Sequence, residues 1–272
     1  VQEIADTLTG IGLEVEGLSE IKALDEKVIV GQIYSIRKHP KADKLNILEV
    51  DLGSHIETIV CGASNVQEKA YVCVAQLGAK LPGGMEITEA SIREQLSKGM
   101  ILSEKEMGLS ENHDGILILD GAPIIGEKVN KLLKLPNTVL TLNVTPNRTD
   151  CLSYLGIARD LSAKLKRPLK TIDDSFIRSA TNKKTLPIHV GSQNCARFTT
   201  LAINMISPIK SPFWIAQRLE ASGIRSINSL VDVTNYVMLE LGQPIHAYDQ
   251  RFVKKEIKVL EAKEGDKLIT LD

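Results

Sequence analysis

Short β-rich segments separated by turn residues constrain the fold of residues 28–136 more than any other feature of this sequence. Strands are expected at 28–34, 45–51, 57–61, 71–75 and 116–119. Turns rich in Gly, Ser, Asn or Pro lie between them at 52–54, 62–65 and 81–84. Short strands at this spacing, with few helices, predict a small barrel or a sandwich.

Helical patterns flank this β-rich stretch on both sides. Residues 1–9 read as the end of a helix, with Gly10 suited to its C′ position. Apolar spacing predicts a helix over about 151–166, capped by Thr149 or Asp150 and ended by Pro168. Helices are also expected from Ser211-Pro212 to Gly223 and over about 229–241, strands at 186–190, 197–206 and 256–261, and a polar linker at 171–184.

Composition narrows the functional classes. The 272 residues allow about two domains, or three small ones. Lys plus Arg number 33 and Asp plus Glu 34, so any nucleic-acid contact must come from a local basic patch. Four dispersed cysteines without a C-x-x-C pair argue against disulfides and a metal site and fit a cytoplasmic protein. The chain has no apolar run of about 18 residues, so no membrane partner is expected. It starts at Val1 within a helical pattern, so we expect a fragment of a longer protein.

A proline-stiffened basic turn is the first candidate site. Its side chains could pair with phosphates, although a solvated loop between strands is the simpler alternative. The candidate residues are Arg37, Lys38, His39, Lys41 and Lys44.

A second candidate lies at 97–103. It combines a glycine that permits close backbone approach with a lysine and two serines, although a surface hairpin would explain it equally. Its candidate residues are Ser97, Lys98, Gly99, Met100 and Ser103.

Together these segments resemble the tRNA-binding OB module found in several synthetases and in free-standing proteins. The matching patterns are H-P-x-A-D-K-L at 39–45, V-D-x-G at 50–53, I-V-C-G-A-x-N at 59–65 and S-x-G-M-x-x-S-E at 97–104. One departure is Leu102, where the family often has cysteine. The resemblance implies a five-stranded barrel over about 28–140 that holds structured RNA, rather than DNA, largely by shape and backbone.

Two further motifs leave their roles open. Arg148 could bind an anion near a helix N-terminus, or the segment 145–153 could serve only for capping and packing. Cys151 has no histidine nearby in sequence and is expected to be buried filler. Between 223 and 249, polar residues surround His246, which Pro244 holds on an extended segment. His246 is either a site residue or a core histidine bonded to the backbone.

These later motifs resemble the β subunit of bacterial phenylalanyl-tRNA synthetase over essentially the whole chain. They read V-T-P-N-R-x-D-C-L-S at 144–153 and G-I-R-x-I-N-x-x-V-D-x-T-N-Y-V-M-L-E-L-G-Q-P-x-H-A-x-D at 223–249. The resemblance implies an α+β multidomain fold. A discontinuous α/β domain (1–27 plus 141–185) would carry the inserted OB-fold barrel (28–140) and precede the start of an α+β editing domain (190–272).

The resemblance also implies partners and chemistry. The family's β subunit forms an (αβ)2 heterotetramer with a catalytic α subunit, which attaches phenylalanine to its tRNA using ATP and Mg²⁺. The β subunit contacts that tRNA and removes mischarged tyrosine. Pro244 and His246 would lie at the editing pocket, whose other residues would follow Asp272. We therefore expect no catalytic residue, no metal site and no bound cofactor in this chain, and no complete editing activity.

Two alternatives remain. One is a stand-alone, non-catalytic tRNA-binding protein that relies on the barrel alone. The other is a protein–protein scaffold with a vestigial barrel. The stretch after residue 190 discriminates against the first, because an autonomous RNA-binding module has no use for it.

Overall fold

The computed structural model describes residues 1–170, 172–173, 175, 186–203, 210–253, 255–267 and 269. Its α-helices are α1 (Gln2–Gly10), α2 (Val129–Leu133), α3 (Tyr154–Leu165), α5 (Phe213–Ala221) and α6 (Ser229–Leu241), and two 3-10 helices are η1 (Thr149–Leu152) and η2 (Gln250–Phe252). None of the helices in these described ranges is long and apolar enough to span a membrane.

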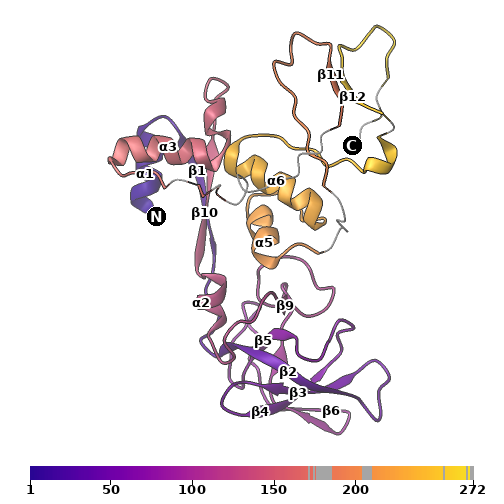
Figure 1. Cartoon of the computed structure of the whole chain (residues 1–272). Coiled ribbons are helices and arrows are strands. Elements are labelled where there is room, and N and C mark those ends of the chain that lie inside the picture. Colours follow the sequence, from indigo (N-terminus) through magenta and orange to yellow (C-terminus); the bar gives the residue numbers. More distant parts are fainter. Residues whose placement is uncertain are drawn as a thin grey trace.

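An antiparallel, nearly closed barrel forms the lower part of the molecule in Figure 1. Its strands are β2 (Val28–Lys38), β3 (Asn46–Asp51), β4 (Ile56–Cys61), β5 (Tyr71–Ala75), β8 (Met100–Ile101) and β9 (Ile118–Leu119). The order is β4-β3-β2-β5-β8, and β9 pairs with β5. The Lys98 N–H donates to the Thr58 carbonyl at 3.0 Å and so links the two ends of this path. The expected mixed fold with a barrel-like β module is confirmed.

The barrel encloses apolar side chains of alternating strand positions. Ile33, Leu48 and Ile59 have no exposed surface and form one core with their neighbours. Leu102 and Leu117 belong to a second cluster. Each such side chain contributes roughly 1.5–3 kcal/mol of burial free energy, so these clusters account for much of the barrel's stability.

A two-stranded ribbon joins the segments before and after the barrel. Strand β1 (Glu14–Ile21) pairs antiparallel with β10 (Asn137–Asn143), from Glu14 opposite Asn143 to Ile21 opposite Asn137. Above it in Figure 1, α1 and α3 pack around a small core that includes Leu8, Leu13 and Cys151. The sequence patterns did not predict this ribbon, which brings the two flanking segments together.

Helix α5 contacts the barrel as well as α6. Phe213, at its start, is 9% exposed and belongs to the same apolar cluster as Met107 and Leu117. The Phe213 N–H donates to Asp120 Oδ2 at 2.6 Å, and Lys210 pairs with Glu104 at 3.6 Å. The barrel and the α5–α6 pair are therefore joined by apolar and polar contacts.

The remaining described elements are short. Strands β11 (Ile188–Val190) and β12 (Ile257–Val259) pair in parallel, which confirms strands at 186–190 and 256–261. The strand expected at 197–206 is wrong over 197–203, which have no strand, and 204–206 lie outside the described residues. The linker expected at 171–184 also lies outside them, apart from 172, 173 and 175.

Several expected helix ends are corrected. Helix α3 is capped by Ser153, whose Oγ accepts from the Gly156 N–H at 3.1 Å, whereas Thr149 and Asp150 lie in η1. Ser211 does not cap α5, because its hydroxyl donates to the Asp232 carboxylate and Pro212 takes the N-cap position.

The expected ends at glycine differ in outcome. Gly10 is the last residue of α1 and not its C′ residue. The end of α6 at Gly242, with φ 78°, is confirmed.

Candidate nucleic-acid interface

The basic turn lies where β2 ends and the chain returns to β3. Arg37, Lys38, Lys41 and Lys44 are exposed, as the sequence predicted. Among the described residues, no ion pair engages Arg37, Lys38 or Lys44. These three cations are therefore free to meet phosphate groups.

His39 is the buried centre of this turn. Its side chain is only 4% exposed, and its backbone N–H donates to the Leu45 carbonyl at 3.1 Å. The Lys41 N–H donates to Nδ1 at 3.0 Å, so the ring carries its proton on Nε2, 3.1 Å from the Ile92 carbonyl oxygen. The structure thus places His39 beneath the turn, where it positions the turn and does not lie on its outer surface.

A β-hairpin lies against this turn. Strands β6 (Ala90–Ile92) and β7 (Gln95–Ser97) are joined by Arg93 and Glu94, whose φ values of 45° and 70° fit a type I′ loop. Lys41 of the basic turn forms an ion pair with Glu94 of the hairpin loop. Sequence reasoning missed Arg93, because the loop lacks the Asn-Gly or Asp-Gly signature of this turn.

The predicted segment 97–103 helps to close the barrel. Ser97 is 3% exposed; its Oγ accepts from the Val60 N–H at 3.0 Å and donates to the Gly99 carbonyl at 3.2 Å. Gly99 has φ 127°, and a Cβ there would lie 2.9 Å from the Ala75 carbonyl oxygen. Only glycine meets both conditions without strain.

The other members of that segment divide by exposure. Ser103 is 7% exposed and exchanges hydrogen bonds with Glu106, whose carboxylate accepts from Ser103 N at 2.6 Å and Oγ at 2.7 Å. Lys98 and Met100 are half-buried, and Met100 packs on the barrel core. The two serines therefore lie inside the protein, and Lys98 is the segment's one cation.

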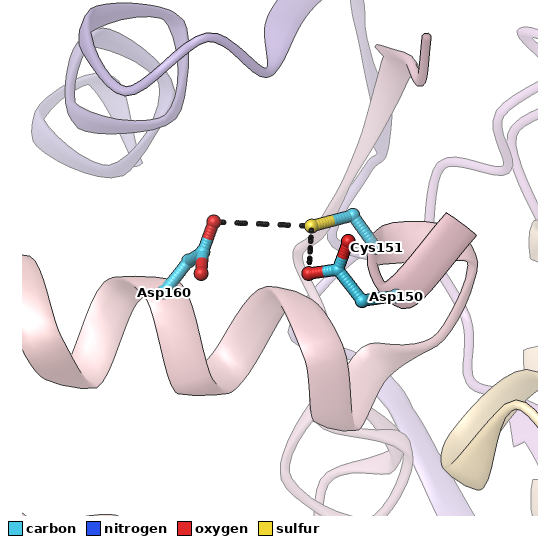
Figure 2. Close-up of side chains that lie close together, drawn as sticks. All are labelled: Asp150, Cys151 and Asp160. Carbon is cyan, nitrogen blue, oxygen red and sulfur yellow. Dashed lines mark hydrogen bonds between the residues drawn. The ribbon is translucent and has the colours of Figure 1, made fainter. Parts of the chain in front are cut away.

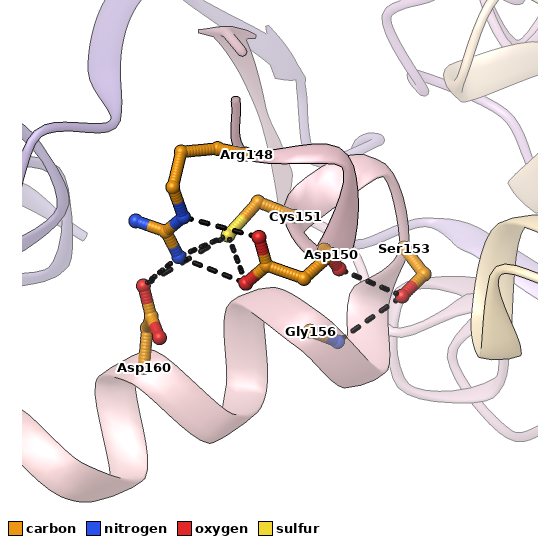
Figure 3. A network of polar contacts seen from close by, with 6 residues as sticks. All are labelled: Arg148, Asp150, Cys151, Ser153, Gly156 and Asp160. Atoms are coloured by element: carbon orange, nitrogen blue, oxygen red, sulfur yellow. Dashed lines mark hydrogen bonds and ion pairs between the residues drawn. The ribbon is translucent and has the colours of Figure 1, made fainter. Parts of the chain in front are cut away.

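Arg148 is held by side chains of its own segment and of helix α3 (Figure 3). Its Nε and Nη2 donate to the two Asp150 oxygens at 3.1 and 2.9 Å, and Nη2 also lies 2.5 Å from Asp160 Oδ2. The hydrogen bonds from Arg148 lower the pKa of Asp150 to about 2, and those carboxylates raise the pKa of Arg148. Packing and local bonding, not anion binding, therefore account for this motif.

Cys151 lies within that cluster, with Sγ 3.3 Å from Asp150 Oδ2 and 3.8 Å from Asp160 Oδ2 (Figure 2). Burial, followed by the neighbouring carboxylates, raises the pKa of its thiol to about 11. The residue is 1% exposed, as predicted. Asp150, Cys151 and Asp160 are close enough to share a cation, but the Arg148 guanidinium already neutralises both carboxylates.

Asp232 is a buried anchor between α5 and α6. It has no exposed surface and accepts hydrogen bonds from Ser211 Oγ, from Ser226 Oγ at 2.6 Å and from Ile227 N at 2.9 Å. Burial raises the pKa of its carboxyl, but these hydrogen bonds together lower that pKa by a larger amount. The pKa of Asp232 therefore lies below its ordinary value. A structural role is sufficient to explain this residue of the 223–249 motif.

The two predicted pocket residues, Pro244 and His246, lie on an exposed segment. Every residue from 241 to 252 is exposed, and the His246 and Tyr248 rings are 6.5 Å apart. Within the described residues, His246 has no hydrogen-bond partner. It is therefore not a satisfied core histidine, and its side chain is exposed.

Two family models match the chain. Residues 28–128 match the model described as "Putative tRNA binding domain", and residues 194–272 match the one described as "B3/4 domain". The barrel with its basic turn therefore falls in the class of tRNA-binding modules.

Relatives match the chain along its whole length. It is 41% identical to the phenylalanine–tRNA ligase β subunit of Syntrophus aciditrophicus (strain SB), over 99% of this chain and 34% of the relative. The β subunit of Francisella tularensis subsp. tularensis is 43% identical over 100% of this chain and 35% of the relative. The chain is similar to phenylalanine–tRNA ligase β subunits, as its motifs predicted, and spans about a third of the length of the relatives it matches.

A solved structure resembles part of the chain only loosely. The C-terminal domain of Plasmodium vivax p43 is 26% identical and covers 40% of this chain and 60% of its own, with a TM-score of 0.29. The match at 194–272 makes a stand-alone RNA-binding module the weaker interpretation.

Proposed function

We propose that this chain is the tRNA-binding and editing-domain portion of a phenylalanyl-tRNA synthetase β subunit. The observation that carries the proposal is the match to such β subunits over 99% or more of the chain. The protein would act in the cytoplasm with a catalytic α subunit, in an (αβ)2 assembly that attaches phenylalanine to its tRNA. The barrel at 28–140 would be inserted in a discontinuous domain of 1–27 and 141–185, followed by the first part of the editing domain at 190–272.

The proposed tRNA contact is electrostatic. Arg37, Lys38, Lys41 and Lys44 are exposed cations of the basic turn. Lys98 is half-buried in the segment that closes the barrel. Each phosphate that they neutralise releases counterions, which makes the affinity fall as salt rises. His39, Ser97, Gly99, Met100 and Ser103 would support the surface from beneath.

ATP and Mg²⁺ would be used by the α subunit. The Asp150–Cys151–Asp160 group does not fit Mg²⁺, because that hard cation requires oxygen ligands and the carboxylates are already bound by Arg148. We therefore assign no step of the ligase reaction to a metal held by this chain.

Pro244 and His246 would line the editing pocket in the complete β subunit. Such a pocket selects tyrosine through a polar partner for the phenol hydroxyl, which would stay unpaired with phenylalanine. In this chain both residues are exposed, so we expect no deacylation of Tyr-tRNA by the chain alone. Deacylation that His246→Ala abolishes would overturn this expectation.

The tRNA contact is tested by anisotropy with labelled phenylalanine tRNA over a range of salt concentrations. Combined Lys38→Glu, Lys41→Glu and Lys44→Glu changes should weaken binding and reduce the slope of log K against log salt by about two to three. A matched charge reversal at Arg159, Lys164 and Arg167, all exposed on or after α3, should leave the slope unchanged. An unchanged slope in the first variant would remove the basic turn from the proposal.

A further inference from the structure

The β6–β7 hairpin is held against the basic turn by two independent contacts. The buried His39 ring donates from Nε2 to the Ile92 carbonyl at 3.1 Å, one residue before the hairpin loop. Lys41 pairs with Glu94, within the loop itself. The turn and the hairpin tip therefore form one continuous surface, although about 50 residues of sequence separate them.

The loop itself is unusual. Arg93 and Glu94 both have positive φ, 45° and 70°, which non-glycine residues adopt only rarely. The flanking ladder from Ala90 opposite Ser97 to Ile92 opposite Gln95 holds this geometry. A two-residue type I′ loop requires positive φ at both positions, so the ladder fixes the backbone from which the Arg93 side chain projects.

The charge at the tip is unbalanced. Lys41 neutralises Glu94, whereas Arg93 is exposed and has no ion pair among the described residues. A guanidinium can bind a phosphate through two parallel hydrogen bonds, a geometry that a lysine cannot offer. The hairpin thus presents one free phosphate-binding group next to the loop position that pairs with Lys41 of the basic turn.

We propose that the β6–β7 hairpin is a second wall of the RNA-binding surface and that Arg93 binds a backbone phosphate of the tRNA there. This inference rests on the proposed function, since it assumes that the basic turn meets the same RNA. It adds a residue that lies outside both binding segments inferred from the sequence. It also explains why His39 is buried, because its ring holds the hairpin in position beside the basic turn.

The test compares three variants of the whole chain by anisotropy with labelled phenylalanine tRNA. Arg93→Glu should weaken binding about 5- to 10-fold and reduce the salt slope by about one. Arg93→Gly should also weaken binding, but it should keep or raise the melting temperature, because glycine adopts φ 45° freely. Arg159→Glu, an equal charge reversal on α3, should change neither affinity nor slope.

The outcomes separate this inference from the proposed function. If the Lys38/Lys41/Lys44 variant loses affinity while Arg93→Glu and Arg93→Gly bind as the Arg159→Glu control does, the hairpin wall is wrong and the proposed function stands. If the wild-type chain shows no salt-dependent tRNA binding, the proposed function and this inference fail together. If Arg93→Glu melts at a lower temperature, Arg93→Gly decides whether charge or folding caused the loss.

Discussion

Truncating Phe213 to alanine is expected to destabilise the barrel, although the residue lies in helix α5. Its ring is 9% exposed and belongs to the apolar cluster that contains Met107 and Leu117. Its backbone N–H donates to Asp120 at 2.6 Å, which fixes the start of α5 on the barrel. The barrel core is therefore completed by a residue from the region that follows it.

The size of the effect follows from burial. Phe→Ala changes in cores cost roughly 3–5 kcal/mol, and a ring that retains 9% exposure belongs at the lower end, about 3 kcal/mol. That free energy corresponds to roughly a 10²-fold change in the equilibrium for opening the barrel. Trp214, the next residue, is 48% exposed and packs on Tyr236 and Arg218 instead of the barrel cluster. Trp214→Ala is therefore the matched control, because it should loosen the α5–α6 pair and leave the barrel core intact.

Amide hydrogen exchange of the whole chain, read by mass spectrometry, measures this effect. Peptides that contain β5 and residues 100–119 should exchange roughly 10²-fold faster in Phe213→Ala, for amides that exchange through barrel opening. Asp120→Ala should remove only the helix-capping interaction, about 1 kcal/mol, and should mainly affect α5. Equal exchange of the barrel peptides in Phe213→Ala and Trp214→Ala would refute the claim that Phe213 of α5 stabilises the barrel.

Three further predictions concern positions outside the barrel. Gly156→Ala should lower the free energy of unfolding by roughly 3 kcal/mol, seen as a lower melting temperature, because a Cβ there would lie 1.7 Å from the Asp150 backbone oxygen. Gly10→Ala, where a Cβ would meet nothing within 4 Å, is the control and should be neutral or stabilising by up to about 1 kcal/mol. Asp232→Asn should destabilise the chain to urea at pH 7, and the difference from wild type should shrink as pH falls below the ordinary carboxyl pKa of about 4. The reason is that the pKa of Asp232 is lower in the folded chain than in the unfolded chain. The ionised carboxylate therefore stabilises the fold at pH values above the unfolded pKa, and this stabilisation is lost when the group is protonated. Iodoacetamide at pH 8 should modify half-exposed Cys195 well before Cys151, whose pKa burial raises to about 11; peptide mapping that finds Cys151 modified first would contradict its buried state.

The barrel strands were predictable because their signals are local. Alternating apolar positions and glycine-containing turns placed the strand at 71–75 with the bounds observed for β5. The β1–β10 ribbon was missed because its two strands pair across the whole intervening barrel, so no turn between them marks the pairing. Barrel closure by the segment before β8 is likewise a contact distant in sequence.

The candidate site was predictable in its charge and not in its supporting residues. Exposed lysines on a proline-containing turn can be read from composition, and Arg37, Lys38 and Lys44 are exposed as expected. The buried roles of His39 and Ser97 depend on backbone groups of residues 92 and 60, which no local pattern reveals. A polar residue in a binding motif can thus serve the fold beneath the surface.

Cross-linking tests the central claim, that this barrel face meets the tRNA, most directly. The chain would be cross-linked to phenylalanine tRNA by ultraviolet light at low salt, and the modified peptides identified by mass spectrometry. We expect adducts in peptides that contain residues 37–44 and 93–98, and their loss when the Lys38/Lys41/Lys44 variant is used. Adducts confined to α1, α3 or the α5–α6 pair, with none on the barrel, would contradict the account.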